Sequence, residues 1–79
     1  MRLRYRITFS SGTVLETNQM RTITHAWMNR YHDAVRYGFS TSRDRAEASA
    51  QRNAAQFEHL LGPVVSTEIT DRVTVVSPT

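Results

Sequence analysis

Residues 1–9 read MRLRYRITF, and this stretch decides the expected fold because it alternates apolar and arginine side chains. The apolar positions are Leu3, Tyr5, Ile7 and Phe9, and the polar positions are Arg2, Arg4, Arg6 and Thr8. A β-strand directs successive side chains to opposite faces of its sheet. The stretch therefore predicts a strand with one face in the core and a second face, here called the arginine face, that carries Arg2, Arg4 and Arg6.

The next residues predict a β-hairpin, because residues 10–12 read SSG and glycine supplies the positive φ that tight turns require. A two-residue turn would pair Phe9 with Val14. A three-residue loop would instead pair Ile7 with Leu15 and place both on the apolar face. We favour the three-residue loop, with a second strand that runs to about residue 17.

Two helices are expected in the middle of the chain. The first follows a cap at Thr22 or Thr24 and ends at Gly38, because apolar residues recur at every fourth position. Those residues are Ile23, Trp27, Tyr31 and Val35.

The second helix is expected to begin at a capping box that starts at Thr41 and to end at about Leu61, before Gly62 and a proline. The residues on its apolar side are small near the start of the helix and large near its end. That side comprises Ala46, Ala50, Ala54, Phe57, Leu60 and Leu61.

Residues 64–76 are rich in valine, threonine and isoleucine and predict one long strand, bent or broken at Asp71-Arg72. The expected order is β-β-α-α-β in a single domain, residues 1–79. We therefore predict an α+β fold, with a three-stranded antiparallel sheet whose central strand is the first and with both helices packed on one face.

The composition excludes several classes of site. The chain has no cysteine, which excludes disulfides and thiolate chemistry. No stretch is long and apolar enough for a membrane span or a signal peptide, so we expect a cytoplasmic protein. His25, His32 and His59 lack the spacing of a metal or catalytic pair. We accordingly predict no catalytic, cofactor or metal site and no enzymatic activity.

All ten basic residues are arginine, and the formal net charge is +3. Arginine suits bidentate binding of phosphate or carboxylate, although a GC-rich genome also explains the absence of lysine. We predict that a partner binds Arg2, Arg4, Arg6 and Arg72. The alternative is a solvated row that pairs with Glu16 and Glu68.

These features favour a small non-enzymatic interaction protein that binds a protein partner or forms a homodimer. The alternative is a nucleic-acid-binding protein that uses the arginine face, where guanidinium groups track phosphates. The aromatic residues Tyr5 and Phe9 lie on the opposite face of the strand, which argues against base stacking on this sheet.

Residues 4–17 read RYRITFSSGTVLET, and helix and a valine-rich terminal strand are expected to follow. In this arrangement, in its length and in its amino-acid bias, the chain resembles small proteins encoded by bacteriophages of GC-rich actinobacteria (actinobacteriophages). The resemblance implies a host-directed, non-enzymatic protein in the host cytoplasm. It transfers no functional residue, because no functional motif matches.

Overall fold

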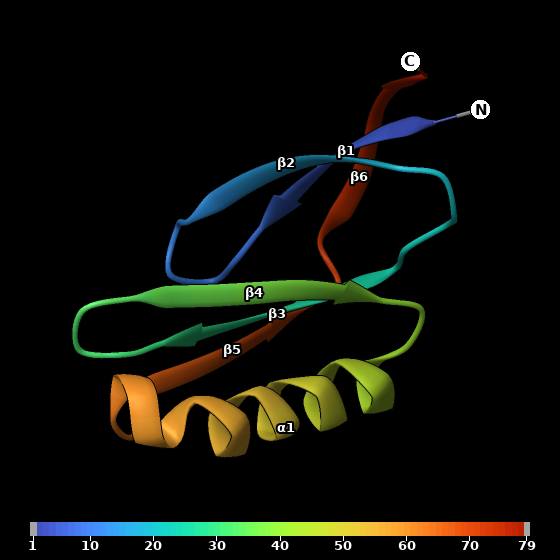
Figure 1. The fold of residues 1–79 in the computed structure, drawn as a ribbon. Coiled ribbons are helices and arrows are strands. Elements are labelled where there is room, and N and C mark those ends of the chain that lie inside the picture. Colours follow the sequence, from blue (N-terminus) through green and yellow to red (C-terminus); the bar gives the residue numbers. More distant parts are fainter. Residues whose placement is uncertain (1, 79) are drawn as a thin grey trace.

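The computed structural model describes residues 2–78, which form six strands and one helix (Figure 1). What we call the outer sheet has the strand order β2 (Val14–Gln19), β1 (Leu3–Thr8), β6 (Val73–Pro78). The central sheet has the order β4 (Val35–Ser40), β3 (His25–Arg30), β5 (Ser66–Thr70). The helix, α1 (Arg43–Leu61), lies between β4 and β5 in sequence.

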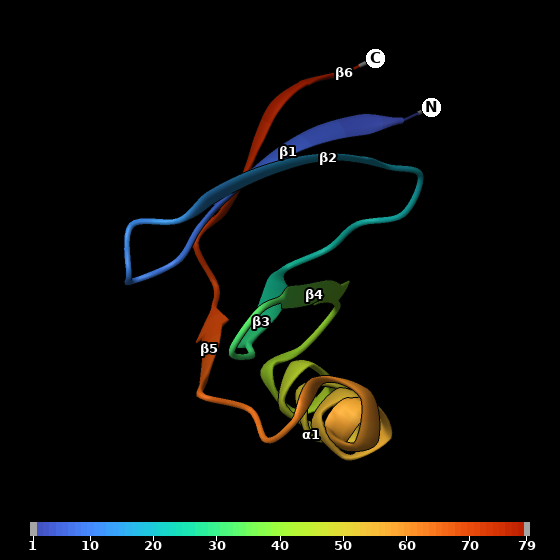
Figure 2. The ribbon, with the colours of Figure 1, turned by 60° about the vertical axis from the view of Figure 1, so that its left-hand side comes forward.

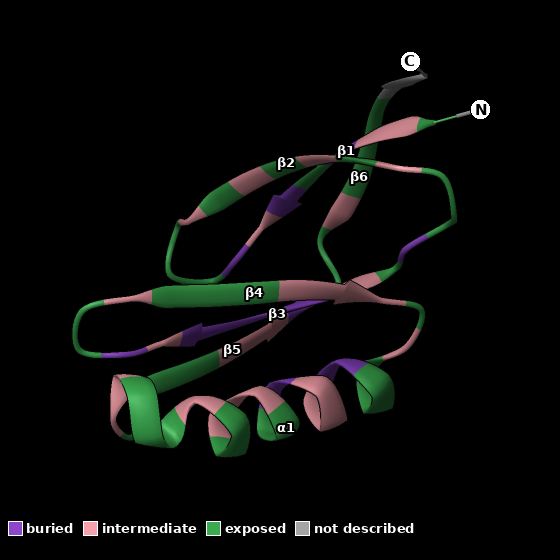
Figure 3. Ribbon diagram, in the orientation of Figure 1, coloured by how far each residue is buried: buried purple, intermediate pink, exposed green. Residues whose placement is uncertain are grey.

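The molecule has three layers, with the outer sheet on one side, the central sheet in the middle and α1 on the other side (Figure 2). Buried residues concentrate in β1 and β3 (Figure 3). The main core lies between the two sheets and contains Tyr5, Ile7, Phe9, Ile23, Ala26 and Met28. A smaller core between the central sheet and α1 contains Trp27, Ala46 and Ala50.

The predicted β-β-α-α-β fold is wrong. The segment expected to form the first helix is the β3–β4 hairpin, and a second sheet, not a pair of helices, covers the apolar face of β1. α1 packs on the far side of that second sheet, so it does not touch the apolar face of the first strand as expected.

The error in the middle segment has a physical cause, since a four-residue spacing equals two strand periods as well as about one helical turn. In β3, Trp27 and Asn29 contact α1, whereas Ala26 and Met28 pack against the outer sheet. Both faces of β3 are therefore buried, which removes the polar alternation that marks a half-exposed strand. The hairpin closes where the Tyr31 N–H donates to the Ala34 carbonyl at 2.8 Å.

The predicted first hairpin is confirmed in its register. Ile7 lies opposite Leu15, and the Phe9 N–H donates to the Thr13 carbonyl at 2.9 Å. Gly12 has a φ of +95°, which side chains rarely allow. The prediction that the last strand pairs with the first, making the first central, is also confirmed in the outer sheet.

The predicted second helix is confirmed as α1, and Gly62 ends it with a φ of +78°. Its cap is Ser42 instead of Thr41, because the Ser42 side chain accepts a hydrogen bond from the Arg45 N–H at 3.2 Å. The small end of the helix packs well, with Ala46 buried. Among the large residues near its end, Leu60 is 78% exposed, whereas Phe57 and Leu61 are half-buried.

The terminal segment divides at residues 71–72, as expected, but its two halves join different sheets. Thr70 fixes the bend: its Oγ1 donates to the Thr8 carbonyl at 2.8 Å and accepts from the Arg72 N–H at 3.1 Å. β5 and β6 thus form one bent segment that connects the central sheet to the outer sheet.

Candidate functional site

The arginine face of β1 is partly neutralised. Nε and Nη2 of Arg4 donate to Oε1 of Glu16 at 3.0 and 2.8 Å, and the same atoms of Arg6 donate to Oε2 at 3.3 Å. The hydrogen bonds from Arg4 and then Arg6 lower the pKa of Glu16. The carboxylate therefore stays ionised and offsets part of the positive charge that the sequence suggested for a binding surface.

The remaining predicted residues lie outside β1. Arg2 is exposed and precedes the strand, and Arg72 is exposed in the bend between β5 and β6. Glu68 lies on the central sheet, not on the outer sheet with Arg4 and Arg6, and accepts hydrogen bonds from Ser10 and Ser11. The structure brings Arg4 and Arg6 together on Glu16 and places Arg72 at a backbone turn.

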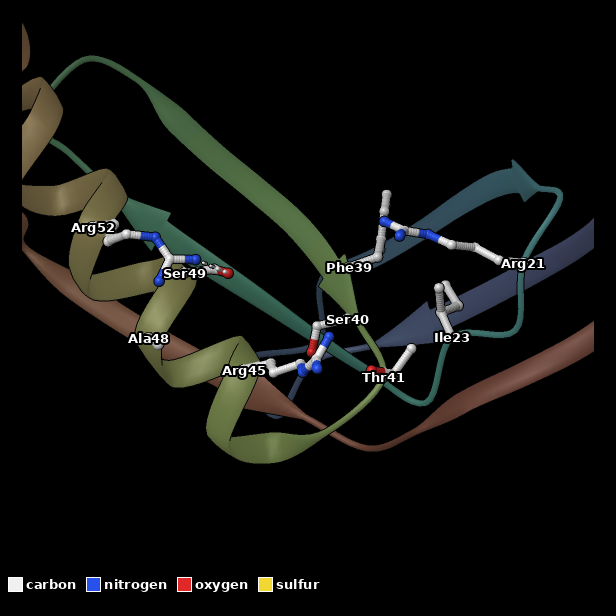
Figure 4. A pocket seen from close by; sticks show the side chains of 9 residues that line it. All are labelled: Arg21, Ile23, Phe39, Ser40, Thr41, Arg45, Ala48, Ser49 and Arg52. Atoms are coloured by element: carbon white, nitrogen blue, oxygen red, sulfur yellow. Dashed lines mark hydrogen bonds between the residues drawn. The ribbon is translucent and has the colours of Figure 1, made fainter.

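A different set of arginines lines a cleft of about 350 Å³ between α1, the end of β4 and the connection from β2 to β3. We call it the arginine cleft, and its three basic residues are Arg21, Arg45 and Arg52. Arg21 extends from the β2–β3 connection, and Arg45 and Arg52 extend from α1 on the other side (Figure 4).

Local structure fixes both walls of the arginine cleft. Arg45 and Arg52 are two helical turns apart, so they share one stripe of α1 with Ser49 between them. On the other wall, Ile23 is buried and anchors the connection that carries Arg21. The Thr24 N–H donates to the Ser40 carbonyl at 3.0 Å, which ties this connection to the end of β4.

The electrostatics of the arginine cleft differ from those of the arginine face, because no carboxylate lines it. Within residues 2–78, the side chains of Arg21 and Arg45 make no ion pair and no hydrogen bond, and Arg52 donates only to Ser49 Oγ, at 3.1 Å. The guanidinium donors of the cleft are thus available to an anion.

The lining also offers a second kind of surface. Ile23 and Phe39 contribute apolar atoms, and Ser40, Thr41 and Ser49 contribute hydroxyl groups. Arginines around a partly apolar cavity suit a ligand that carries both a negative charge and an apolar group.

Other chemistries find less support in the part of the chain that the structure describes. No three His, Asp or Glu side chains there gather into a group that could hold a metal ion. His32 lies in the exposed β3–β4 turn beside Asp33, with 3.8 Å between Nε2 and Oδ1. Within residues 2–78, no helix has the length and apolar character needed to cross a bilayer.

Sequence reasoning missed the arginine cleft. The spacing of Arg45, Ser49 and Arg52 was visible as a helical stripe without an acidic residue. Arg21 gave no such signal, because it joins the other two only through the packing of the β2–β3 connection against β4.

Comparisons of the chain with protein-family models, curated proteins and solved structures found no match. The resemblance to actinobacteriophage proteins therefore stays a prediction, and the function is argued from the cleft.

Proposed function

We propose that this chain is a small non-enzymatic binding protein and that its arginine cleft docks a negatively charged partner. The observation that carries the proposal is the grouping of Arg21, Arg45 and Arg52 around one cavity without a carboxylate in its lining. The proposal keeps the interaction role expected from the sequence and moves the binding surface from the arginine face to the arginine cleft.

Charge distribution supports this location. Arg4 and Arg6 share the carboxylate of Glu16, and Arg43 donates to Glu47 at 3.0 Å. Each such pair reduces the local potential that attracts an anionic partner, whereas arginines without a counter-charge focus the field of a cleft. The long-range attraction should therefore be strongest at the arginine cleft.

Two triple variants with the same net charge test the location. The first replaces Arg21, Arg45 and Arg52 by Gln, and the matched control replaces Arg4, Arg6 and Arg72 by Gln. We expect the cleft variant to elute from immobilised heparin, a generic polyanion, at lower salt than the control, with circular dichroism confirming that both are folded. Equal elution of the two variants, or earlier elution of the control, would contradict the proposal.

A further inference from the structure

We propose that the arginine cleft binds a nucleoside phosphate unit, with the phosphate bound by the arginines and the base packed against the apolar residues of the lining. This inference rests on the proposed function, since it names the class of anion that the cleft takes. The same unit occurs in a free nucleotide and in a single-stranded nucleic acid.

The size of the arginine cleft argues against a bare inorganic anion as its full occupant. Its volume is about 350 Å³. A phosphate ion displaces only a few water molecules, each of which occupies about 30 Å³ in the liquid. Small-molecule pockets begin at roughly 300 Å³, so the cleft is large enough for a ligand that carries an organic group beside its charge.

The distribution of side chains matches the two halves of such a ligand. Arg21 lies on one wall and Arg45 and Arg52 lie on the other (Figure 4), so either wall offers guanidinium donors to phosphate oxygens. Phe39, near the end of β4, and Ile23, on the wall that carries Arg21, contribute apolar atoms to the lining. An aromatic ring can stack on any base, which makes this surface tolerant of base identity.

The hydroxyl groups of the lining suit the sugar. Ser49 Oγ accepts the hydrogen bond from Arg52, so its own proton remains available to a ligand oxygen. Ser40 Oγ donates to the Ser42 carbonyl at 2.7 Å and accepts from the Ser42 N–H at 3.3 Å, which leaves one lone pair for a ligand donor. A donor and an acceptor beside the arginines fit ribose hydroxyls, which act in both senses.

Tyr37, which lies outside the arginine cleft, offers a way to distinguish a free nucleotide from a single-stranded nucleic acid as the ligand. Tyr37 lies two residues before Phe39 on β4, the ring centroids are 5.8 Å apart, and Tyr37 is 51% exposed. Tyr37 is not among the residues that line the cleft, so a strand that leaves the cleft along β4 would gain this exposed ring as an additional contact.

Amide chemical-shift titrations of the whole protein test the inference in about 50 mM salt, where phosphate contacts are strong. The probes are uridine monophosphate, ribose 5-phosphate, inorganic phosphate, a uridine decamer and a phosphoserine peptide. We expect uridine monophosphate to shift the resonances of the cleft and to bind about tenfold more tightly than ribose 5-phosphate, which lacks the base.

The outcomes are distinguishable. Equal affinities for uridine monophosphate, ribose 5-phosphate and inorganic phosphate would overturn the inference but leave the proposed function standing, as would tighter binding of the phosphoserine peptide. If no probe shifted the resonances of the cleft but heparin retention still depended on the cleft arginines, the inference would be overturned and the proposed function would stand. Absence of both shifts and cleft-dependent retention would overturn both proposals.

The decamer identifies the source. If the natural ligand is a strand, the decamer binds more tightly than uridine monophosphate, and Tyr37→Ala removes that gain without changing the affinity for the mononucleotide. If the ligand is a free nucleotide, the gain is absent and Tyr37→Ala affects neither probe. The variant Arg45→Gln should weaken both probes in either case, and an unchanged affinity would overturn the inference.

Discussion

At the scale of single residues, Gly38 shows how one missing side chain permits the packing of another. It pairs with Trp27 across β3 and β4, and a Cβ atom at position 38 would lie 2.6 Å from the Trp27 indole nitrogen. Trp27 is buried in the core beneath α1. The sequence indicated a helix stop here, whereas the structure uses the glycine for close approach.

We expect Gly38→Ala to lower the free energy of unfolding by about 1–3 kcal/mol, because the added methyl group overpacks a filled site. Urea titration followed by circular dichroism measures the loss. The control is the same substitution in a Trp27→Leu background, where the smaller side chain makes room. If Gly38→Ala costs as much in that background, steric contact with Trp27 is not the cause.

Asn29 is the second informative residue, because it is a fully buried polar side chain in the central strand β3. Its Nδ2 donates to the Ala50 carbonyl at 2.8 Å and to Asn53 Oδ1 at 3.2 Å. Its Oδ1 accepts from Thr67 Oγ1 at 2.7 Å. One side chain thus links β3, β5 and α1.

We expect Asn29→Ala to destabilise the protein by about 2–3 kcal/mol, because it removes the hydrogen bonds of Asn29 to Ala50, Asn53 and Thr67 and opens a cavity. Asn18→Ala, at an exposed position of β2, is the matched control and should change stability by less than about 0.5 kcal/mol. Thermal unfolding compares the two variants, and similar losses would show that the buried network contributes little.

At the scale of elements, the sequence predicted the elements that keep one face in solvent and failed for the strand that is buried on both faces. The hairpin of β1 and β2 could be read from the sequence, because its outer face is solvated and the alternation of polar and apolar residues survives. The helix α1 was recognisable from its terminator at Gly62. The β3–β4 hairpin could not be recognised, because layers on both sides of β3 bury Ala26 and Trp27 alike.

The turn between β1 and β2 is attached to the central sheet by Glu68. Its Oε1 accepts from Ser10 Oγ at 3.1 Å and from the Ser11 N–H at 3.0 Å. Its Oε2 lies 3.9 Å from Nε of Arg30, and Nη2 of Arg30 donates to Thr13 Oγ1 at 2.6 Å. Burial acts to raise the pKa of Glu68, but the hydrogen bonds from Ser11 and Ser10 and the charge of Arg30 outweigh it, so the pKa lies below its usual 4.5.

Because the pKa of Glu68 is lower in the folded chain than in the unfolded chain, its ionised form favours folding. We therefore expect its contribution to be complete above about pH 4.5 and to disappear as the pH falls through the folded-state pKa. Urea unfolding between neutral and acidic pH measures this loss. Glu68→Gln should lose about 2 kcal/mol at neutral pH and show a weaker acid dependence.

The exposed Glu58→Gln variant is the control for Glu68→Gln, and it should leave both the stability and its acid dependence close to those of the parent. Glu16 also has a lowered pKa, but its ion pairs with Arg4 and Arg6 are exposed and are screened by salt. Repeating the titration at high salt separates the two carboxylates. An unchanged acid dependence in Glu68→Gln would contradict the assignment.

At the scale of the whole molecule, two three-stranded sheets share one core. β1 contributes Tyr5 and Ile7 to it, and β3 contributes Ala26 and Met28. The bent segment of β5 and β6 connects the sheets through the backbone, and Glu68 connects them through the hairpin turn. Neither sheet can bury its apolar face without the other, because α1 covers only the opposite side of the central sheet.

This interdependence predicts cooperative unfolding of the two sheets. In native-state hydrogen exchange, the amides of Ile7 in β1 and Met28 in β3 should open with the same free energy, equal to that of global unfolding by urea. The exposed turn residue Asp33 serves as the control and should exchange through local fluctuations. If the Ile7 amide opened at a free energy more than about 1 kcal/mol below that of Met28, the outer sheet would be a separate, weaker unit. The central sheet and α1 would then have to remain folded with Ala26 and Met28 exposed, which the burial of those side chains makes unfavourable.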